Sequence, residues 1–208
     1  MGVRQQRKEQ TRRRILAAAR HLLDEHGYEG ATLRGVALEA GVTAGGIFVH
    51  FTGKDALMMA ALADEIERLL GSAHSAFPHD APLIDQLHHH PRWLLRAYAE
   101  RPVLRDLLRR TFTLQVEDTG PLFAQAAVAV ATWAQHIERA QARGELRSDT
   151  DHTLMAKACW AYYWQAVTLL LQGEPPSVDE PIALNRALLE QLLRGAKGAQ
   201  AIAAEQDP

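Results

Sequence analysis

The sequence contains one cysteine, Cys159, and has no long uninterrupted hydrophobic run. One cysteine excludes an intramolecular disulfide framework and is typical of a protein in a reducing compartment. The longest nearly apolar stretch, residues 124–134, is too short to span a bilayer and includes Gln125 and Thr132. No basic leader followed by an apolar segment opens the chain. We therefore expect a cytoplasmic protein with no membrane partner.

The motifs of common enzymes are also missing. There is no Gly-x-Ser-x-Gly elbow, phosphate loop or dinucleotide fingerprint. Three consecutive histidines, His88–His90, would point to different sides of a helix, and no acidic residue or cysteine follows them four positions later. We expect this run to face solvent near Pro91, and Cys159 to be a buried structural thiol. The sequence predicts neither an enzyme nor a cofactor or metal site.

The alternation of apolar and polar residues that marks a half-buried strand is absent too, and no internal repeat is found. Apolar residues instead recur with helical spacing along most of the chain, which predicts an all-α fold. Thr32 and Thr43 are predicted N-caps, the segment Ser148-Asp149-Thr150-Asp151 is expected to cap the start of a helix, and Gly144 is a predicted C-cap. The expected helices cover 15–26, 33–40, 44–50, 54–70, 83–100, 102–114, 121–143, 150–172 and 180–197, with a looser boundary over 72–82.

Charge is distributed unevenly along the chain. Residues 1–20 carry seven basic side chains against one acidic side chain, Glu9, whereas the residues after Lys54 are net acidic. A basic end on an acidic body is typical of a protein that binds nucleic-acid phosphates with one end. The alternative is a solvated, disordered cationic tail.

One block near the N-terminus has the pattern of a helix-turn-helix. Two helices that cross at a tight turn need a small residue in the first helix, which Ala37 supplies. They also need a residue that tolerates positive φ four positions later, which is Gly41. Ile47, six residues further on, would fill the gap between the helices. The three residues lie between the predicted caps Thr32 and Thr43, and together they predict the motif.

From Thr11 to about Leu57 the residues resemble the TetR family of transcriptional regulators. The matching positions are Ile15, Ala18, Ala19, Leu22, Gly27, Thr32, Val36-Ala37, Ala40-Gly41-Val42-Thr43, Gly45, Ile47-Phe48, His50-Phe51 and Lys54. The resemblance implies a three-helix, helix-turn-helix head and a helical bundle body. It implies a DNA-binding domain over 1–54 and a ligand-binding and dimerisation domain over 55–200; we expect a frayed tail over 201–208.

The resemblance also implies residue roles. The short helix after Thr43 would lie in the major groove of a double-stranded operator, while Thr32 and Lys54 would contact phosphates. Phe48 and His50 would approach the sugar-phosphate backbone, and Phe51 would anchor the motif in the head. The predicted DNA-binding residues are Arg14, Thr32, Arg34, Thr43, Ala44, Gly45, Gly46, Phe48, His50 and Lys54.

The chain departs from the family pattern in residues 44–48, the part of the motif expected to face the bases, called here the reading edge. Phe48 stands where the family often has tyrosine, Ala44 where a polar or basic residue is common, and Gly46 where a hydroxyl residue is common. No long side chain at this tip reaches a base edge. We therefore expect base recognition to be shared with Arg34, Thr43 and the basic N-terminal arm.

Most aromatic residues lie in the body, where the family encloses a small-molecule effector. The candidate pocket residues are Trp93, Phe112, Phe123, Trp133, Trp160 and Trp164, which predicts an apolar or aromatic ligand. Excess leucine in the last two helices predicts a homodimer through Leu169, Leu188, Leu189 and Leu192. Core packing alone is the alternative for both sets. The sequence thus predicts a ligand-responsive repressor, the alternative being a helical protein-interaction module with weakened DNA binding.

Overall fold

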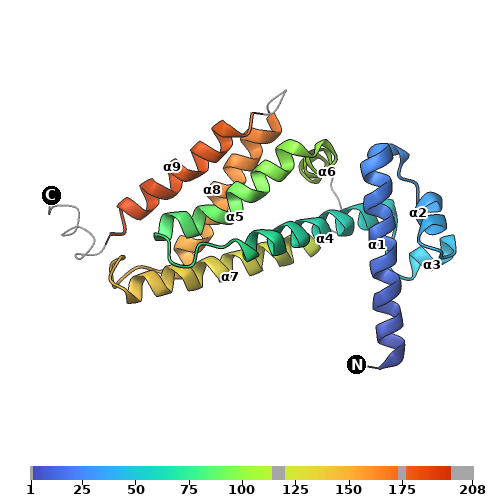
Figure 1. The fold of residues 1–208 in the computed structure, drawn as a ribbon, viewed down its shortest axis with the longest axis horizontal. Coiled ribbons are helices and arrows are strands. Elements are labelled where there is room, and N and C mark those ends of the chain that lie inside the picture. The colour runs from blue at the N-terminus through green and yellow to red at the C-terminus, as the bar shows by residue number, and fades with distance from the viewer. Residues whose placement is uncertain (1, 114–119, 173–176, 198–208) are drawn as a thin grey trace. The chain divides into compact units, whose positions relative to one another are not determined.

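A computed structural model describes residues 2–113, 120–172 and 177–197 of the chain. Over these ranges the regular elements are helices, and one isolated antiparallel bridge joins Leu146 to Lys197. The helices in Figure 1 are α1 (Val3–Gly30), α2 (Leu33–Glu39), α3 (Ala44–Phe48), α4 (Lys54–Ser75), α5 (Leu83–Glu100), α6 (Pro102–Thr113), α7 (Gly120–Ala142), α8 (His152–Gln172) and α9 (Asp179–Arg194). The all-α prediction is confirmed. The expected tail over 201–208 lies outside the described residues.

Local signals in the sequence set several helix ends. The hydroxyl oxygens of Thr32 and Thr43 each accept a hydrogen bond from the backbone N–H three residues later, at 3.1 and 3.0 Å. A carboxylate oxygen of Asp151 accepts the equivalent bond at the start of α8, at 2.9 Å. Gly144 has a φ of 78° just after α7, a conformation that favours glycine. The predicted caps Thr32, Thr43 and Gly144 are confirmed, and within the expected capping segment 148–151 the residue that accepts the bond is Asp151.

Two helices differ from the expected boundaries. The basic arm is not a disordered tail, because α1 already begins at Val3 and continues to Gly30, with a break at Gly27, where φ is 66°. Helix α4 extends to Ser75, so the looser connection is shorter than the expected 72–82. Between α4 and α5 the first proline is Pro78, and α4 ends shortly before it, at Ser75.

Backbone contacts divide the chain into two compact units. The head unit comprises residues 1–68 and 101–123, and the body unit comprises residues 69–100 and 124–208. The head unit is larger than the domain expected to end at residue 54, because it includes much of α4 and because α6 packs against α1. The assignment of DNA binding and ligand binding to the two parts stays a prediction.

Each unit has its own hydrophobic core. In the head, the fully buried side chains include Ile15 of α1, Ile47 of α3 and Leu57 of α4. Burial of one such side chain contributes roughly 1.5–3 kcal/mol. In the body, α5, α8 and α9 pack against one another and bury Leu95 and Leu189. Among the described helices, none is both long and apolar enough to cross a membrane.

Candidate nucleic-acid interface

The predicted helix-turn-helix is present in the head unit. Ala37 and Ile47 are buried where α2 and α3 meet, and Val36 beside them is fully buried. Gly41 has a φ of 63° in the turn, as its position requires. Phe51 is buried just after α3, in agreement with its expected anchoring role. The motif thus holds α3 by its apolar side and leaves the opposite side in solvent.

The solvent side of α3 has few polar groups. Ala44, Gly45 and Phe48 are exposed, and the Phe48 side chain is 57% exposed. Val49, directly after the helix, is 66% exposed. Arg34 is exposed on the neighbouring α2 and is the nearest long cationic side chain on the two helices of the motif. The bare reading edge that the sequence indicated is therefore a property of the folded surface.

Arg14, a predicted DNA contact, has a structural contact within the head. Its guanidinium donates to the backbone carbonyl oxygens of Ala40 and Gly41, the latter at 3.2 Å. A cation near the last carbonyls of a helix stabilises that end, so Arg14 ties α1 to the end of α2. Its side chain is also exposed, and a contact with DNA stays a prediction.

Lys54 lies at the first position of α4. Its Nζ atom is 4.5 Å from the centre of the Tyr28 ring and 3.3 Å from the carbonyl oxygen of Glu29, to which it donates. Arg110 of α6 lies over the same ring at 4.0 Å. These contacts hold the Lys54 ammonium group in place, and its expected contact with a phosphate stays a prediction.

His50 follows α3 and is half-buried. Burial is the main cause that lowers its pKa, and the cations Lys8 and Arg12 add to the effect. The buried Nδ1 atom has no hydrogen-bond partner among the described residues. Arg12 also lies 5.3 Å from the centre of the Phe51 ring. The start of the basic helix α1 therefore faces the end of the helix-turn-helix.

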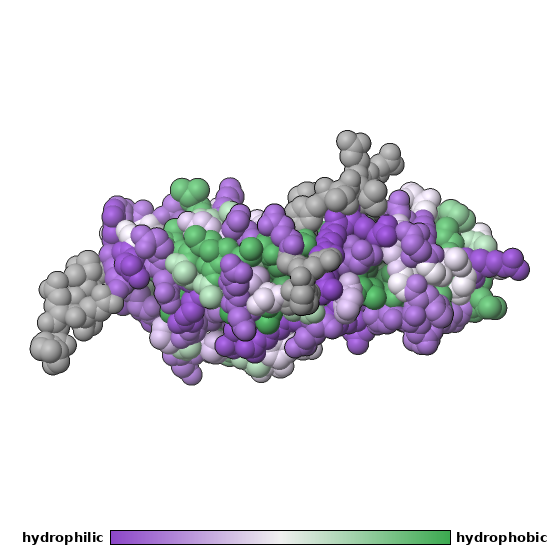
Figure 2. Space-filling model, turned by 90° about the horizontal axis from the view of Figure 1, so that it is seen from above, coloured by the Kyte–Doolittle hydropathy of each residue, from purple (hydrophilic) through white to green (hydrophobic). Residues whose placement is uncertain are grey.

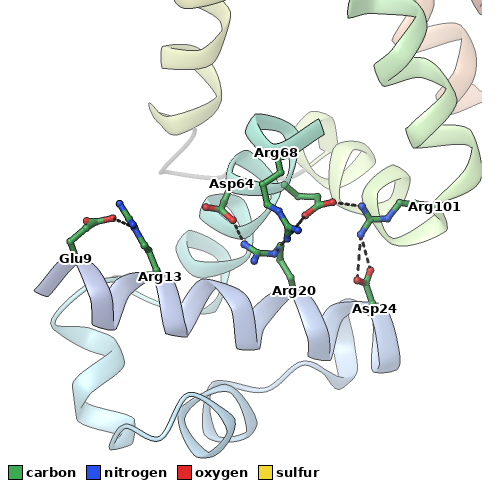
Figure 3. A network of polar contacts seen from close by, with 8 residues as sticks. Glu9, Arg13, Arg20, Asp24, Asp64, Arg68 and Arg101 are labelled. Atoms are coloured by element: carbon green, nitrogen blue, oxygen red, sulfur yellow. Dashed lines mark hydrogen bonds and ion pairs between the residues drawn. The ribbon is translucent and has the colours of Figure 1, made fainter. Parts of the chain in front are cut away.

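An ion-pair network around the buried carboxylate of Glu65 joins segments of the head unit, and sequence reasoning missed it (Figure 3). Glu65 of α4 is buried and contacts Arg20 of α1 at 3.6 Å and Arg68 at 3.5 Å. Arg101, just before α6, also pairs with Glu65, and it contacts Asp24 of α1 at 3.3 Å. The carboxylate of Glu65 thus joins α4 to α1 and to the segment just before α6. Helical spacing alone does not reveal such long-range pairs.

Residues 15–61, which contain this motif, match the family model described as bacterial regulatory proteins, tetR family. Over this segment the chain is similar to regulators of the TetR family. It is 42% identical over 62 residues to the HTH-type transcriptional repressor Rv1474c of Mycobacterium tuberculosis, which is 30% of this chain and 33% of that protein. It is 35% identical over 60 residues to the HTH-type transcriptional regulator UidR of Escherichia coli, 29% of this chain and 31% of UidR. The chain thus matches about a third of the length of these relatives.

The fold of the whole chain is similar to that of solved TetR-family structures. A putative TetR-family regulator from Rhodococcus sp. has a TM-score of 0.67 at 22% identity, covering 89% of this chain and 99% of that one. RolR in complex with resorcinol has a TM-score of 0.67 at 18% identity, and the match covers 97% of this chain and 94% of RolR. FadR from Bacillus subtilis in complex with stearoyl-CoA has a TM-score of 0.64 at 16% identity, and the match covers 88% of this chain and 97% of FadR. The similarity of fold to these structures therefore extends through the body unit.

An aromatic cluster lies within this TetR-like body. The ring of Trp160 is 6.4 Å from that of Trp133 and 5.5 Å from that of Trp164, so three predicted pocket residues come together. Sequence reasoning missed the hydrogen bond between the hydroxyl groups of Tyr98 and Tyr163, which are 3.1 Å apart and fully enclosed. Burial raises the pKa of Tyr98 to about 12, so both hydroxyl groups are neutral donors and acceptors.

Of the other predicted pocket residues, Trp93 lies apart from this cluster. Trp93 is 37% exposed, and its ring lies 6.3 Å from that of His89, outside the tryptophan cluster. The side chains of Phe112 and Phe123 lie outside the described part of the structure. Cys159 is buried, as expected, and burial raises its pKa to about 12.

The leucines expected at a dimer interface differ in exposure. Leu189 is buried within the single chain, so it packs in the body core. Leu169, Leu188 and Leu192 are half-buried. Figure 2 views the molecule from the side on which Figure 1 draws α9 and shows a hydrophobic area between hydrophilic margins there.

The expectation that the His88–His90 run faces solvent is wrong. His88 and His89 are buried, and the Nε2 atoms of these rings donate to the carbonyl oxygens of Ile182 at 3.2 Å and Ala73 at 2.8 Å. The helix continues through Pro91, and its buried face includes both rings. These rings can be buried because backbone carbonyl groups from distant parts of the chain satisfy their N–H groups. Among the described residues, no three histidine, cysteine or acidic side chains are arranged to hold a metal ion.

Proposed function

We propose that the chain is a ligand-responsive transcriptional repressor that binds double-stranded DNA as a homodimer in the cytoplasm. The observation that carries this proposal is the helix-turn-helix of Ala37, Gly41 and Ile47 inside a segment that matches the TetR family. The relatives that align with this segment include transcriptional repressors. The exposed side of α3 and the basic start of α1 supply the shape and the charge for a DNA groove.

Two features support an effector and a dimer. The body contains the cluster of Trp133, Trp160 and Trp164, and the structural neighbours RolR and FadR have been solved with resorcinol and stearoyl-CoA. The half-buried Leu188 and Leu192 lie four residues apart and share one side of α9. A second copy that covers this side would place two heads on two half-sites about 34–36 Å apart.

The proposed mechanism uses α4, which starts at Lys54 in the head unit and ends at Ser75 in the body unit. A ligand that fits the body in only one helix arrangement would shift α4 and change the spacing of the two heads. DNA and effector would then oppose each other, with a coupling free energy of about 1–3 kcal/mol.

A mobility-shift titration with DNA flanking the chain's own gene tests the DNA-binding part. We expect a shift that weakens steeply between 50 and 200 mM salt, values chosen because phosphate contacts release counterions over this range. The variant Arg34→Ala should weaken the shift, whereas Arg92→Ala, an exposed arginine of α5, should not. If no fragment shows a salt-sensitive shift, the alternative of a helical protein-interaction module is favoured.

Sedimentation and tryptophan fluorescence test the other two parts. The double variant Leu188→Glu and Leu192→Glu should dissociate the dimer, and Leu154→Glu, at an exposed position of α8, should leave it intact. A compound that changes the fluorescence of the Trp160 cluster should release the DNA fragment over the same concentration range. A compound that binds there without affecting DNA affinity would contradict the coupling.

A further inference from the structure

The solvent face of α3 is made of hydrocarbon. Ala44 and Phe48 are four residues apart, as are Gly45 and Val49, so these four positions form one continuous face opposite the buried Ile47. Val49 keeps helical backbone angles at the C-cap (φ −69°, ψ −22°), so it belongs to the same face. Phe48 and Val49 are among the most exposed large hydrophobic residues of the described chain.

The polar groups near this face are few and partly used. The Thr43 hydroxyl oxygen accepts the Gly46 N–H as a helix cap. The absent Cβ at Gly45 leaves open space, since a Cβ built there would meet only the Thr43 hydroxyl oxygen, at 4.0 Å. A duplex can therefore approach this face closely, but the face offers no long donor or acceptor to a base edge.

A hydrocarbon face matches one group in the major groove. Among the base edges, only thymine presents a methyl group there, and the other bases present hydrogen-bond donors and acceptors. A donor or acceptor pressed against Phe48 or Val49 would lose water without gaining a partner, which costs free energy. The apolar face therefore disfavours the other bases as well as favouring thymine.

We propose that α3 selects its DNA site by contacts between thymine methyl groups and Ala44, Phe48 and Val49. The inference rests on the proposed function and adds the chemical class of base that the head recognises. Charge complementarity identifies DNA as the occupant of this face, because Arg34 lies on the neighbouring α2 and Arg12 of the basic helix α1 lies over the ring of Phe51, just after α3. Arg34 and phosphate contacts supply affinity, and α3 supplies the preference for thymine.

The test uses the full chain and a duplex that it binds, obtained by selection from random double-stranded DNA. Each thymine of the selected site is replaced in turn by deoxyuridine, which lacks only the methyl group. Burial of one methyl group corresponds to about a fourfold change in Kd. We expect the Kd to rise about threefold to tenfold at one or more positions in each half-site and to stay constant at the others.

Two variants connect the effect to α3. Val49→Ser should bind the thymine duplex more weakly and lose sensitivity to deoxyuridine at one position. Val128→Ser is the matched control, since Val128 of α7 is 67% exposed and Val49 is 66% exposed; it should keep the full sensitivity. Ala44→Gln should shift the selected base toward adenine, because a glutamine amide pairs with the adenine edge.

The outcomes separate this inference from the proposed function. If a sequence-specific site is bound equally well with thymine and deoxyuridine at every position, the inference is overturned and the regulator proposal stands. If Val49→Ser and Val128→Ser respond alike to deoxyuridine, the methyl contacts do not lie on the α3 face and the inference is overturned. If the chain selects no DNA sequence at all, both proposals fail.

Discussion

The ring of Phe77 is stacked on the ring of His136, with 4.8 Å between their centroids and 22° between their planes. Three other histidine rings, those of His79, His89 and His90, lie 5.0–5.5 Å from the same phenylalanine. The segment after α4, helix α5 and helix α7 thus contribute imidazoles around one apolar ring in the body unit. No carboxylate is among the charges that act on His90 or His136.

This cluster predicts that the body loses stability in acid. Burial, and then the neighbouring His89, His74 and His136, lower the pKa of His90 from 6.5 to about 4. Burial also lowers the pKa of His136, with Arg139, His79 and His74 adding to it. Because the folded state holds these rings neutral, their contribution is complete above pH 6.5 and is lost as pH falls below it, toward about 4 for His90.

We expect protonation of His90 alone to lower the free energy of unfolding by on the order of 2 kcal/mol over that pH range, a figure reduced for the partial exposure of the ring. Thermal melts at a series of pH values between about 7.5 and 4.5 measure this loss of stability. His90→Leu should flatten the pH dependence, and His21→Leu, at an exposed position of α1, should not. Equal pH slopes in the two variants would show that the cluster is not responsible.

The turn of the helix-turn-helix predicts a specific glycine requirement. Gly41 has a φ of 63°, and an added Cβ would lie 2.9 Å from the Arg14 guanidinium. Gly41→Ala should cost about 1–2 kcal/mol of unfolding free energy, mainly through backbone strain. Gly71→Ala is the control, because Gly71 lies inside α4 with open space at its Cβ position and should gain up to about 1 kcal/mol. Urea denaturation measures both changes, and a neutral Gly41→Ala would contradict the strain argument.

Local patterns predicted much of the head and less of the body. Thr32, Thr43 and Gly41 were predictable because capping and positive φ depend on a few neighbouring residues. The burial of His88–His90 was not predictable, since the acceptors that satisfy these rings come from Ala73 and Ile182, distant in sequence. The same holds for two partners of Glu65, Arg20 and Arg101, which are distant in sequence, whereas Arg68 lies three residues along the same helix.

Glu65 is predicted to be the residue on which the head's ion-pair network depends. Its carboxylate is buried between Arg20, Arg68 and Arg101, so Glu65→Ala would leave guanidinium groups in the network without that carboxylate. Loss of a buried, charged hydrogen-bond partner costs about 1–3 kcal/mol here, less than in a fully buried pair, because Arg68 is 63% exposed and Arg20 and Arg101 keep Asp64 and Asp24 as partners. Chemical denaturation of the variant should show this loss. Glu67→Ala, at an exposed position on the same helix, should change stability by less than about 0.5 kcal/mol.

Lys54 is predicted to contribute to DNA affinity regardless of sequence. Its ammonium group is held over the Tyr28 ring at the first position of α4, ready for a phosphate. Lys54→Ala should weaken binding about threefold to tenfold at low salt and reduce the slope of log K against log salt by about 1, on specific and non-specific duplexes alike. Lys157→Ala, at an exposed position of α8, should leave both values unchanged. A structural role alone would lower the melting temperature of Lys54→Ala and leave the salt slope intact, because no phosphate contact would have been lost.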